Sequence, residues 1–279
     1  MSEIQNRLTR MNYFEKGKHL QIFYWNITST ALHSHDFFEI EIVLKGNGTH
    51  VLNAKDYPLQ PGMIWLCTPA DFHELILDEP AEYWSLIFDE SVISPERYQS
   101  ILDSGAICTI ISPEKLKRID KAVQLLNEEL ATDGNIRSLM EYILETLLPA
   151  EQIKEDLSPI RQAILYTETF FKNKLTLTSV ASQVGLSPTY FGNLFKKETG
   201  ETYINYLNHK RVTFAMNLLD NGMSVSSACF ESGFGSLSGF LHTFKKITGI
   251  SPNEYRNRKS EHKISEDYLI KQTKGGSDS

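Results

Sequence analysis

The chain has 279 residues, about twice the length of a typical single domain, so we expect two domains. Hydrophobic residues make up 41% and charged residues 23%, which excludes a mainly disordered chain. Without a membrane-spanning apolar run or the apolar core of an export signal, the sequence predicts a cytoplasmic protein with no membrane partner. Three scattered cysteines without a CxxC pair exclude a disulfide framework and a cysteine-based zinc site.

The net charge of −7 is unevenly distributed along the chain. Residues 158–260 carry 12 Lys and Arg against 6 Asp and Glu, a balance of +6. Residues 1–157 carry 13 against 25, a balance of −12. This division predicts that only the basic part contacts a polyanion.

From Leu20 to Asp89 the apolar residues alternate or form short runs, which is typical of β-strands. Gly46-Asn47-Gly48 predicts a hairpin, and the stretch 57–62 predicts a loop. The expected strands are Leu20–Asn26, Phe38–Lys45, Thr49–Ala54, Met63–Cys67, Glu74–Leu77 and Tyr83–Phe88. So many short strands predict a small antiparallel barrel or sandwich.

After Pro95 the apolar spacing becomes helical. Two consecutive stripes are formed by Leu116, Ile119, Val123, Leu126 and Leu130, and by Ile136, Leu139, Ile143 and Leu147. Because both stripes are short, we favour their packing onto the barrel; the alternative is that one forms a dimer seam. The polar, proline-bounded stretch 149–159 predicts an interdomain linker.

From Pro159 onward the pattern is helical and one motif occurs twice. The copies are Ala181-x3-Gly185-Leu186-x4-Phe191-x3-Phe195-Lys196-Lys197-x2-Gly200-x5-Tyr206 and Cys229-x3-Gly233-Phe234-x5-Phe240-x3-Phe244-Lys245-Lys246-x2-Gly249-x5-Tyr255. A small residue in the first helix, a glycine at the turn and apolar anchors four apart are typical of a helix-turn-helix. Two copies in the basic part of the chain therefore predict DNA binding.

In each second helix, the phenylalanines define the buried face and predict an exposed stripe opposite. The stripes are Thr189, Gly192, Asn193 and Lys196 in the first copy, and Ser238, Leu241, His242 and Lys245 in the second. Asn can bond adenine, His can donate to guanine, and Leu241 suits a thymine methyl group. Lys197, Lys246, Arg256 and Arg258 are expected to contact phosphates. The alternative is a solvated helix face.

The run from Leu177 to Arg256 resembles the AraC/XylS family of bacterial transcription regulators. The matching segments are Val180–Phe191, Phe195-Lys196-Lys197-x2-Gly200, Tyr206-x4-Arg211-x3-Ala215-x2-Leu218-Leu219 and Gly233-Phe234-x5-Phe240-x3-Phe244-Lys245-Lys246-x2-Gly249-x-Ser251-Pro252-x2-Tyr255-Arg256. The resemblance implies two helix-turn-helix subdomains joined by a long helix at 202–220, with recognition helices in successive major grooves. Two residues depart from the family pattern: His242 replaces a usual Arg, and Cys229 a common Ala. The base that His242 reads is therefore open.

In the acidic part, His33-Ser34-His35-Asp36-Phe37-Phe38-Glu39 followed by Gly46 reads HxHx3Ex6G, and Gly62-x6-Pro69-x3-His73 follows. These segments resemble the two cupin motifs and the cupin sensor domain of many AraC-type regulators. His33, His35 and Glu39 share odd parity, so we expect one strand to direct them to the same side, with His73 on a neighbouring strand.

Three interpretations of this cluster compete. The residues could ligate a metal in a cupin oxygenase or isomerase, form a self-satisfied polar cluster, or bind the hydroxyls of a small molecule such as a sugar. In the third case the stacking candidates are Trp25, Trp65, Tyr83 and Trp84. The regulator context favours the sensor, so we expect no enzyme activity, cofactor or metal; a metal-dependent enzyme tethered to DNA is the alternative.

The sequence thus predicts an α+β protein with four segments: a cupin-like sensor barrel at 1–95, a helical dimerisation or linker region at 96–157, an all-α tandem helix-turn-helix domain at 158–260, and a polar tail at 261–279. The expected partners are double-stranded DNA, a small-molecule effector, a second copy of the chain and RNA polymerase.

Overall fold

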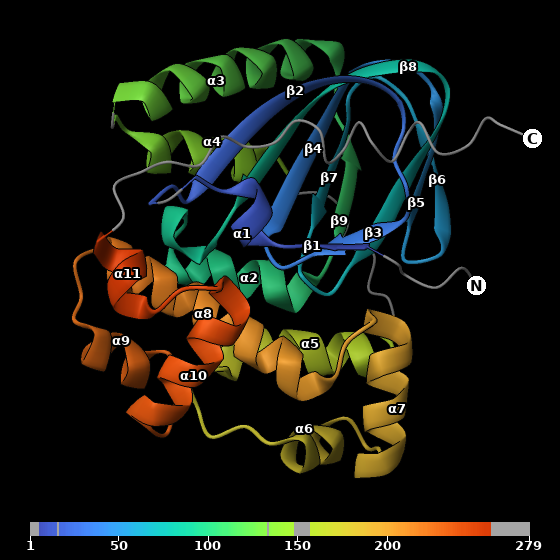
Figure 1. Ribbon diagram of the computed structural model, residues 1–279. Coiled ribbons are helices and arrows are strands. Elements are labelled where there is room, and N and C mark those ends of the chain that lie inside the picture. Colours follow the sequence, from blue (N-terminus) through green and yellow to red (C-terminus); the bar gives the residue numbers. More distant parts are fainter. Residues whose placement is uncertain (1–5, 16, 133, 148–156, 258–279) are drawn as a thin grey trace, which may run out of the picture. The chain divides into compact units, whose positions relative to one another are not determined.

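The computed structural model describes residues 6–15, 17–132, 134–147 and 157–257 (Figure 1). Contacts divide the chain into two compact units: one is formed around residues 19–155, and the other by residues 1–18 together with 156–264. Most of the expected linker and all of the polar tail lie outside the described residues. Among the described helices, none is long and apolar enough to cross a membrane.

The first unit is built on an antiparallel sheet in which one long strand, β8 (Phe72–Phe88), pairs with four others. Those four are β2 (Leu20–Ser29), β3 (His33–His35), β4 (Phe38–Lys45) and β5 (Gly48–Leu52). Strand β7 (Met63–Cys67) pairs with β4 and with β9 (Ile107–Ile110). Strand β6 (Lys55–Leu59) pairs with β5. The half-barrel and the following helices give the expected α+β architecture.

Several strand predictions were wrong in detail. The expected strands 74–77 and 83–88 are parts of the single strand β8, and β3, β6 and β9 were not predicted. Pro58, expected in a loop, lies within β6. A proline is tolerated there because β6 pairs with β5 alone among the described strands, so the missing N–H interrupts no ladder on the other side.

The hairpin prediction at Gly46-Asn47-Gly48 was also wrong. Strands β4 and β5 do not pair with each other; both run antiparallel to β8, along its second and first halves. The glycines therefore form a corner between two segments that follow one strand. Gly46 has a φ of 104°, and a Cβ there would lie 2.7 Å from the Ala81 Cα, so only glycine fits. The tight hairpin occurs instead at Asn53 and Ala54, between β5 and β6.

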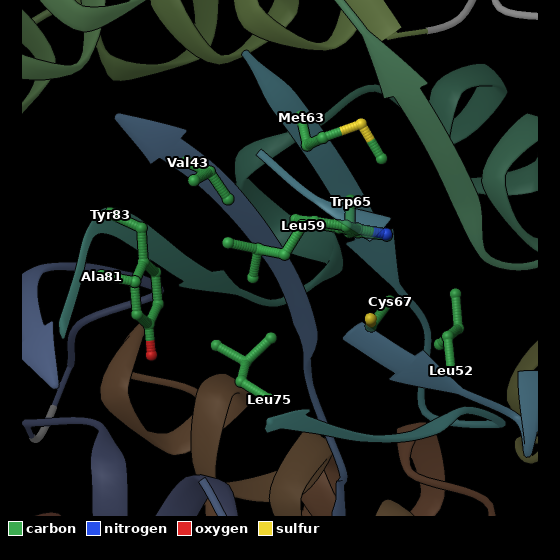
Figure 2. Packing of buried hydrophobic residues seen from close by; sticks show 9 residues of the cluster. All are labelled: Val43, Leu52, Leu59, Met63, Trp65, Cys67, Leu75, Ala81 and Tyr83. Carbon is green, nitrogen blue, oxygen red and sulfur yellow. The ribbon is translucent and has the colours of Figure 1, made fainter. Parts of the chain in front are cut away.

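The interior of the half-barrel is filled by apolar side chains that alternate along the strands (Figure 2). The cluster comprises Val43, Leu52, Leu59, Met63, Trp65, Cys67, Leu75, Ala81 and Tyr83. Trp65 and Cys67 are fully buried neighbours on the inner face of β7 (Figure 2). This packing surrounds the polar residues that share the same face of the sheet.

The helices of this unit are α2 (Pro95–Ser104), α3 (Pro113–Thr132) and α4 (Ile136–Leu147), after the short 3-10 helix η1 (Glu90–Val92). Helices α3 and α4 lie side by side (Figure 1). The middle of the first stripe, Ile119, Val123 and Leu126, is buried within the unit. This burial agrees with the packing interpretation rather than a seam formed by the stripe itself.

The second unit contains seven helices of the described residues after 157, with β1 (Asn6–Leu8) and α1 (Arg10–Tyr13) from the start of the chain. They are α5 (Pro159–Phe170), α6 (Leu177–Gln183), α7 (Pro188–Thr199), α8 (Tyr203–Asp220), α9 (Val225–Glu231), α10 (Leu237–Thr248) and α11 (Pro252–Asn257). Helix α8 begins after Thr202, whose side chain accepts from the Asn205 N–H, so the expected long connecting helix is confirmed.

The two helix-turn-helix copies have the same local geometry. Helices α7 and α10 both end at a glycine, Gly200 and Gly249, with φ of 79°, a left-handed C-cap. Their anchors Phe191, Phe195, Phe240 and Phe244 are fully buried. The duplicated sequence therefore folds into two equivalent supersecondary units.

A buried ion pair joins α5 to α8 in this unit. Lys210 Nζ lies 2.7 Å from Glu168 Oε2, and Tyr206 OH donates to Glu168 Oε1 at 2.7 Å. Both charged side chains are less than 8% exposed. Removing one partner leaves the other charge buried, which costs more than the pair itself contributes.

We therefore predict that Glu168→Ala lowers the free energy of unfolding of the helical unit by about 3–5 kcal/mol, whereas Glu168→Leu with Lys210→Met recovers more than half of the loss. Urea denaturation of the full chain measures both variants. Glu82→Ala, which removes the carboxylate paired with the exposed Lys45 ammonium, is the control and should change little. A double variant as unstable as the single one would contradict the role assigned to the buried charge.

Candidate functional site

Helix α7 presents a polar surface opposite its buried phenylalanines. Ser187 accepts from the Tyr190 N–H and Pro188 occupies the first turn, so the helix start is well defined. Thr189, Asn193 and Lys196 are exposed, while Gly192 is half-buried. A recognition helix contacts base edges mainly through its N-terminal residues, and Thr189 and Asn193 lie in the first half of α7.

Helix α10 repeats this arrangement. Ser238, His242 and Lys245 are exposed, and Leu241 is 38% exposed. Lys197 and Lys246 lie in the last turns of their helices, and Arg256 lies in the last turn of α11; all three are exposed. All the residues expected to contact DNA within the described part of the chain are accessible. Arg258 lies outside the described residues.

The sensor unit contains a cluster of buried histidines and carboxylates. His33 on β3 pairs in register with His73 on β8, and their rings lie 4.3 Å apart between centroids. Glu39 Oε2 lies 3.4 Å from both His35 Nε2 and His73 Nε2. The four residues expected from the sequence are therefore brought together.

The prediction that a single strand carries His33, His35 and Glu39 was wrong. His33 and His35 belong to β3, whereas Glu39 belongs to β4, with Asp36 and Phe37 between the strands. Two strands, not one, therefore direct the three side chains. His33 is paired directly opposite His73, whereas Glu39 is paired opposite Ile87 and meets His73 through its side chain and not through strand pairing.

Three further members of the cluster were missed. Glu41 Oε2 lies 3.6 Å from both His50 Nε2 and His73 Nδ1, and these two nitrogens are 3.2 Å apart. Cys67 lies beside them, with a donor atom within 4.8 Å of those of His50 and His73. Glu41 shares the parity of Glu39 on β4, which was a usable signal; the positions of His50 and Cys67 depend on strand pairing.

Burial and mutual charge shift the pKa values of these groups. Burial lowers the pKa of His33 to about 3 and that of His35 to about 4. Burial alone would lower the pKa of His73, but the Glu39 and Glu41 carboxylates raise it to about 10. The pKa of Glu41 is raised by burial, whereas the surrounding histidines overcome burial and lower the pKa of Glu39. His73 is thus held charged between two carboxylates.

Two of the four expected stacking residues, Trp25 and Trp84, lie apart. Trp25 on β2 is half-buried and packs against the inner apolar cluster. Trp84 lies on the opposite face of β8, where its indole N–H donates to Asp120 Oδ1 of α3 at 2.7 Å. The structure does not bring Trp84 to the histidine cluster.

The histidines are also oriented as metal ligands are. His33 Nδ1 lies 2.8 Å from the Ala31 carbonyl and His35 Nδ1 2.7 Å from the Phe37 carbonyl. A carbonyl only accepts, so each Nδ1 carries the hydrogen and each Nε2 keeps its lone pair. With Glu39 and His73, these nitrogens fit a divalent transition metal, as in cupin enzymes.

Each of the two structural units matches a known domain family. Residues 24–147 match the AraC-like ligand binding domain, and residues 180–258 match a helix-turn-helix domain. The HTH-type transcriptional regulator YfiF of Bacillus subtilis is 25% identical over 277 residues, covering 90% of this chain and 87% of that protein. The HTH-type transcriptional activator RhaS of Escherichia fergusonii is 25% identical over 244 residues, covering 80% and 86%.

Among solved structures, fatty-acid-bound ToxT of Vibrio cholerae covers 87% of this chain and 96% of its own, at 13% identity and a TM-score of 0.39. The two domain matches are in the same order as the two structural units, and the relatives that span most of the chain are helix-turn-helix regulators. The chain belongs to the AraC family of transcriptional regulators.

Proposed function

We propose that the protein binds a specific, asymmetric DNA site through α7 and α10 and that a small molecule bound in the half-barrel controls this binding. The observation that carries the proposal is the pair of equivalent exposed stripes, Thr189 to Lys196 and Ser238 to Lys245, in the basic part of the chain. Two recognition surfaces in one chain allow two segments of DNA to be read without a second copy.

Readout and positioning are assigned to different residues. Asn193 suits adenine, Thr189 and Ser238 are versatile, His242 suits guanine and Leu241 suits a thymine methyl group. Lys196, Lys245, Lys197, Lys246 and Arg256 supply positive charge toward phosphates, which fixes the register on DNA. The chain thereby combines base contacts with an electrostatic contribution that depends on salt.

The effector site that we propose is formed by His33, His35, Glu39 and His73, with Trp25 as the apolar neighbour. Buried donors and acceptors of this kind match the hydroxyl groups of a sugar. His35 Nε2 and His73 Nε2 are buried and form no protein hydrogen bond among the described residues. A bound molecule with hydroxyl groups would satisfy them.

The second candidate function is that of a metal-dependent cupin enzyme, favoured by the Nδ1-to-carbonyl hydrogen bonds of His33 and His35. We favour a regulator without enzyme activity because the relatives that span most of the chain are transcriptional regulators. Stoichiometric metal with substrate turnover by the purified protein would reverse this preference.

We further propose a cytoplasmic homodimer that activates transcription with RNA polymerase. The relatives RhaS and RhaR are named transcriptional activators. Ile119, Val123 and Leu126 are buried within the chain, so a seam on α3 would use its exposed face, where Leu125 is 44% exposed. Leu125→Lys should then yield monomers in sedimentation equilibrium.

The readout assignment predicts that Asn193→Ala and His242→Ala each weaken binding to the specific site by about 1–3 kcal/mol and leave random DNA unaffected. Lys197→Ala should instead weaken both and reduce the log–log salt slope by about 0.9. Asn205→Ala, which truncates an exposed side chain outside the two stripes, is the matched control. Equal weakening on random DNA by Asn193→Ala would show that Asn193 is not a base contact.

The tandem arrangement predicts the shape of the footprint. Two recognition helices in one chain should protect two major-groove segments roughly 10 bp apart, about 34 Å along the axis. Hydroxyl-radical and methylation footprinting of one bound chain measures the spacing. Protection of a single groove segment per chain would show that one copy does not read DNA.

The effector assignment predicts that a ligand found by thermal-shift screening of the full chain loses its effect in Glu39→Gln. At a ligand concentration of about 100 Kd, the wild-type chain should gain about 2.7 kcal/mol of stability. Trp84→Phe, altered on the opposite face of β8, should respond as the wild type does. A ligand that stabilises the chain but changes neither DNA affinity nor transcription would contradict the sensor function.

A further inference from the structure

A second set of metal-ligand residues lies on the inner side of the effector cluster. It is formed by His50, Cys67 and His73, each less than 2% exposed, with Glu41 between the two histidines. These residues come from four strands, β5, β7, β8 and β4. The set shares only His73 with the cupin-motif residues, and it approaches that ring through Nδ1 instead of Nε2.

The distances within this set match a metal coordination sphere. Ligands bound tetrahedrally at about 2.0–2.1 Å lie about 3.4 Å from one another. His50 Nε2 and His73 Nδ1 are 3.2 Å apart, and each lies 3.6 Å from Glu41 Oε2. Three donor atoms thus form one face of a tetrahedron of the required size, and Cys67 is the fourth residue within reach.

Hydrogen bonding alone does not account for this arrangement. Glu41 Oε2 is buried and makes no hydrogen bond among the described residues, although two histidine nitrogens face it at 3.6 Å. A buried carboxylate oxygen without a hydrogen bond is costly. His50 Nε2 and His73 Nδ1 share a hydrogen bond of 3.2 Å with each other, which leaves the carboxylate oxygen out. A cation held between Glu41 and the two imidazoles would replace that hydrogen bond and satisfy the carboxylate oxygen as well.

We propose that the sensor unit binds one divalent zinc-class ion through His50, Cys67, His73 and Glu41. Two imidazoles, one thiolate and one carboxylate form a mixed N/S/O set that suits Zn²⁺ and its spectroscopic substitute Co²⁺, and not Mg²⁺ or Ca²⁺. As the metal binds, the Cys67 thiol and the His73 Nδ1–H each transfer a proton to solvent, which frees the sulfur and nitrogen lone pairs for the metal. Glu39 Oε2 faces the other side of that ring, 3.4 Å from His73 Nε2.

The absence of a CxxC pair in the sequence does not exclude this site. That motif requires paired cysteines close in sequence, whereas one cysteine and two histidines meet here only through strand pairing. The inference does not rest on the proposed function, because metal binding is measured without DNA or effector.

The test is a Co²⁺ titration of the chelator-treated full chain, followed by absorption spectroscopy. We expect one ion per chain, strong tetrahedral d–d bands and a sulfur-to-cobalt charge-transfer band. X-ray absorption of the wild-type Zn²⁺ complex should show one sulfur at about 2.3 Å with nitrogen and oxygen at about 2.0–2.2 Å. This second measurement requires no variant and therefore does not depend on a substituted chain folding.

Variants then separate the two metal-ligand sets. Cys67→Ser should abolish the charge-transfer band, and His50→Ala should lower Co²⁺ affinity at least tenfold. His33→Ala, altered only in the cupin-motif set, and Cys108→Ser, altered in a thiol outside both sets, should retain the band. A wild-type complex without sulfur ligation, a chain that binds no stoichiometric Co²⁺, or loss of the metal in His33→Ala but not in His50→Ala would overturn the proposal.

Discussion

The pairing of β8 with four other strands is the constraint on which the sensor unit depends. Its second half lies between β2 and β4, and its first half pairs with β3 and β5. The Gly46 corner exists because β4 and β5 must follow the same strand, where a side chain would collide with Ala81. His73 lies near the start of β8, so β3 and β5, which pair there, bring His33 and His50 close to it, while Glu39 and Glu41 of β4 reach the same imidazole with their side chains. Strand pairing therefore creates both the apolar interior and the polar cluster.

Burying the polar cluster costs desolvation free energy, whereas burying the apolar interior does not. Glu39, Glu41, His35, His50 and His73 are all buried, and unpaired charges at such positions are strongly unfavourable. His73 offsets this cost by lying between the two carboxylates, with a raised pKa that keeps it charged. The remaining unsatisfied atoms are the ones to which we assign the proposed effector and the proposed metal ion.

The helical unit contains two helix-turn-helix copies that are built in the same way. Each copy buries two phenylalanines and ends its recognition helix at a left-handed glycine, so the exposed stripe is determined by helical periodicity alone. This explains why all the DNA-contact candidates among the described residues are accessible. The buried Lys210–Glu168 pair was not anticipated, because the two residues are 42 apart in sequence and lie on helices that meet only in the folded unit.

The sequence by itself determined the two-part organisation, the duplicated helix-turn-helix, the family and the residues of both recognition stripes. These features depend on local periodicity and on spacing within a few turns of helix. It also placed His33, His35, Glu39 and His73 in one cluster, but through the wrong reasoning about a single strand. The tertiary structure alone decided that Trp84 lies on the opposite face, that β4 and β5 do not form a hairpin, and that His50 and Cys67 join Glu41 beside His73. These outcomes follow from pairing between distant strands, whose register depends on how the whole sheet closes and is not encoded in any one segment.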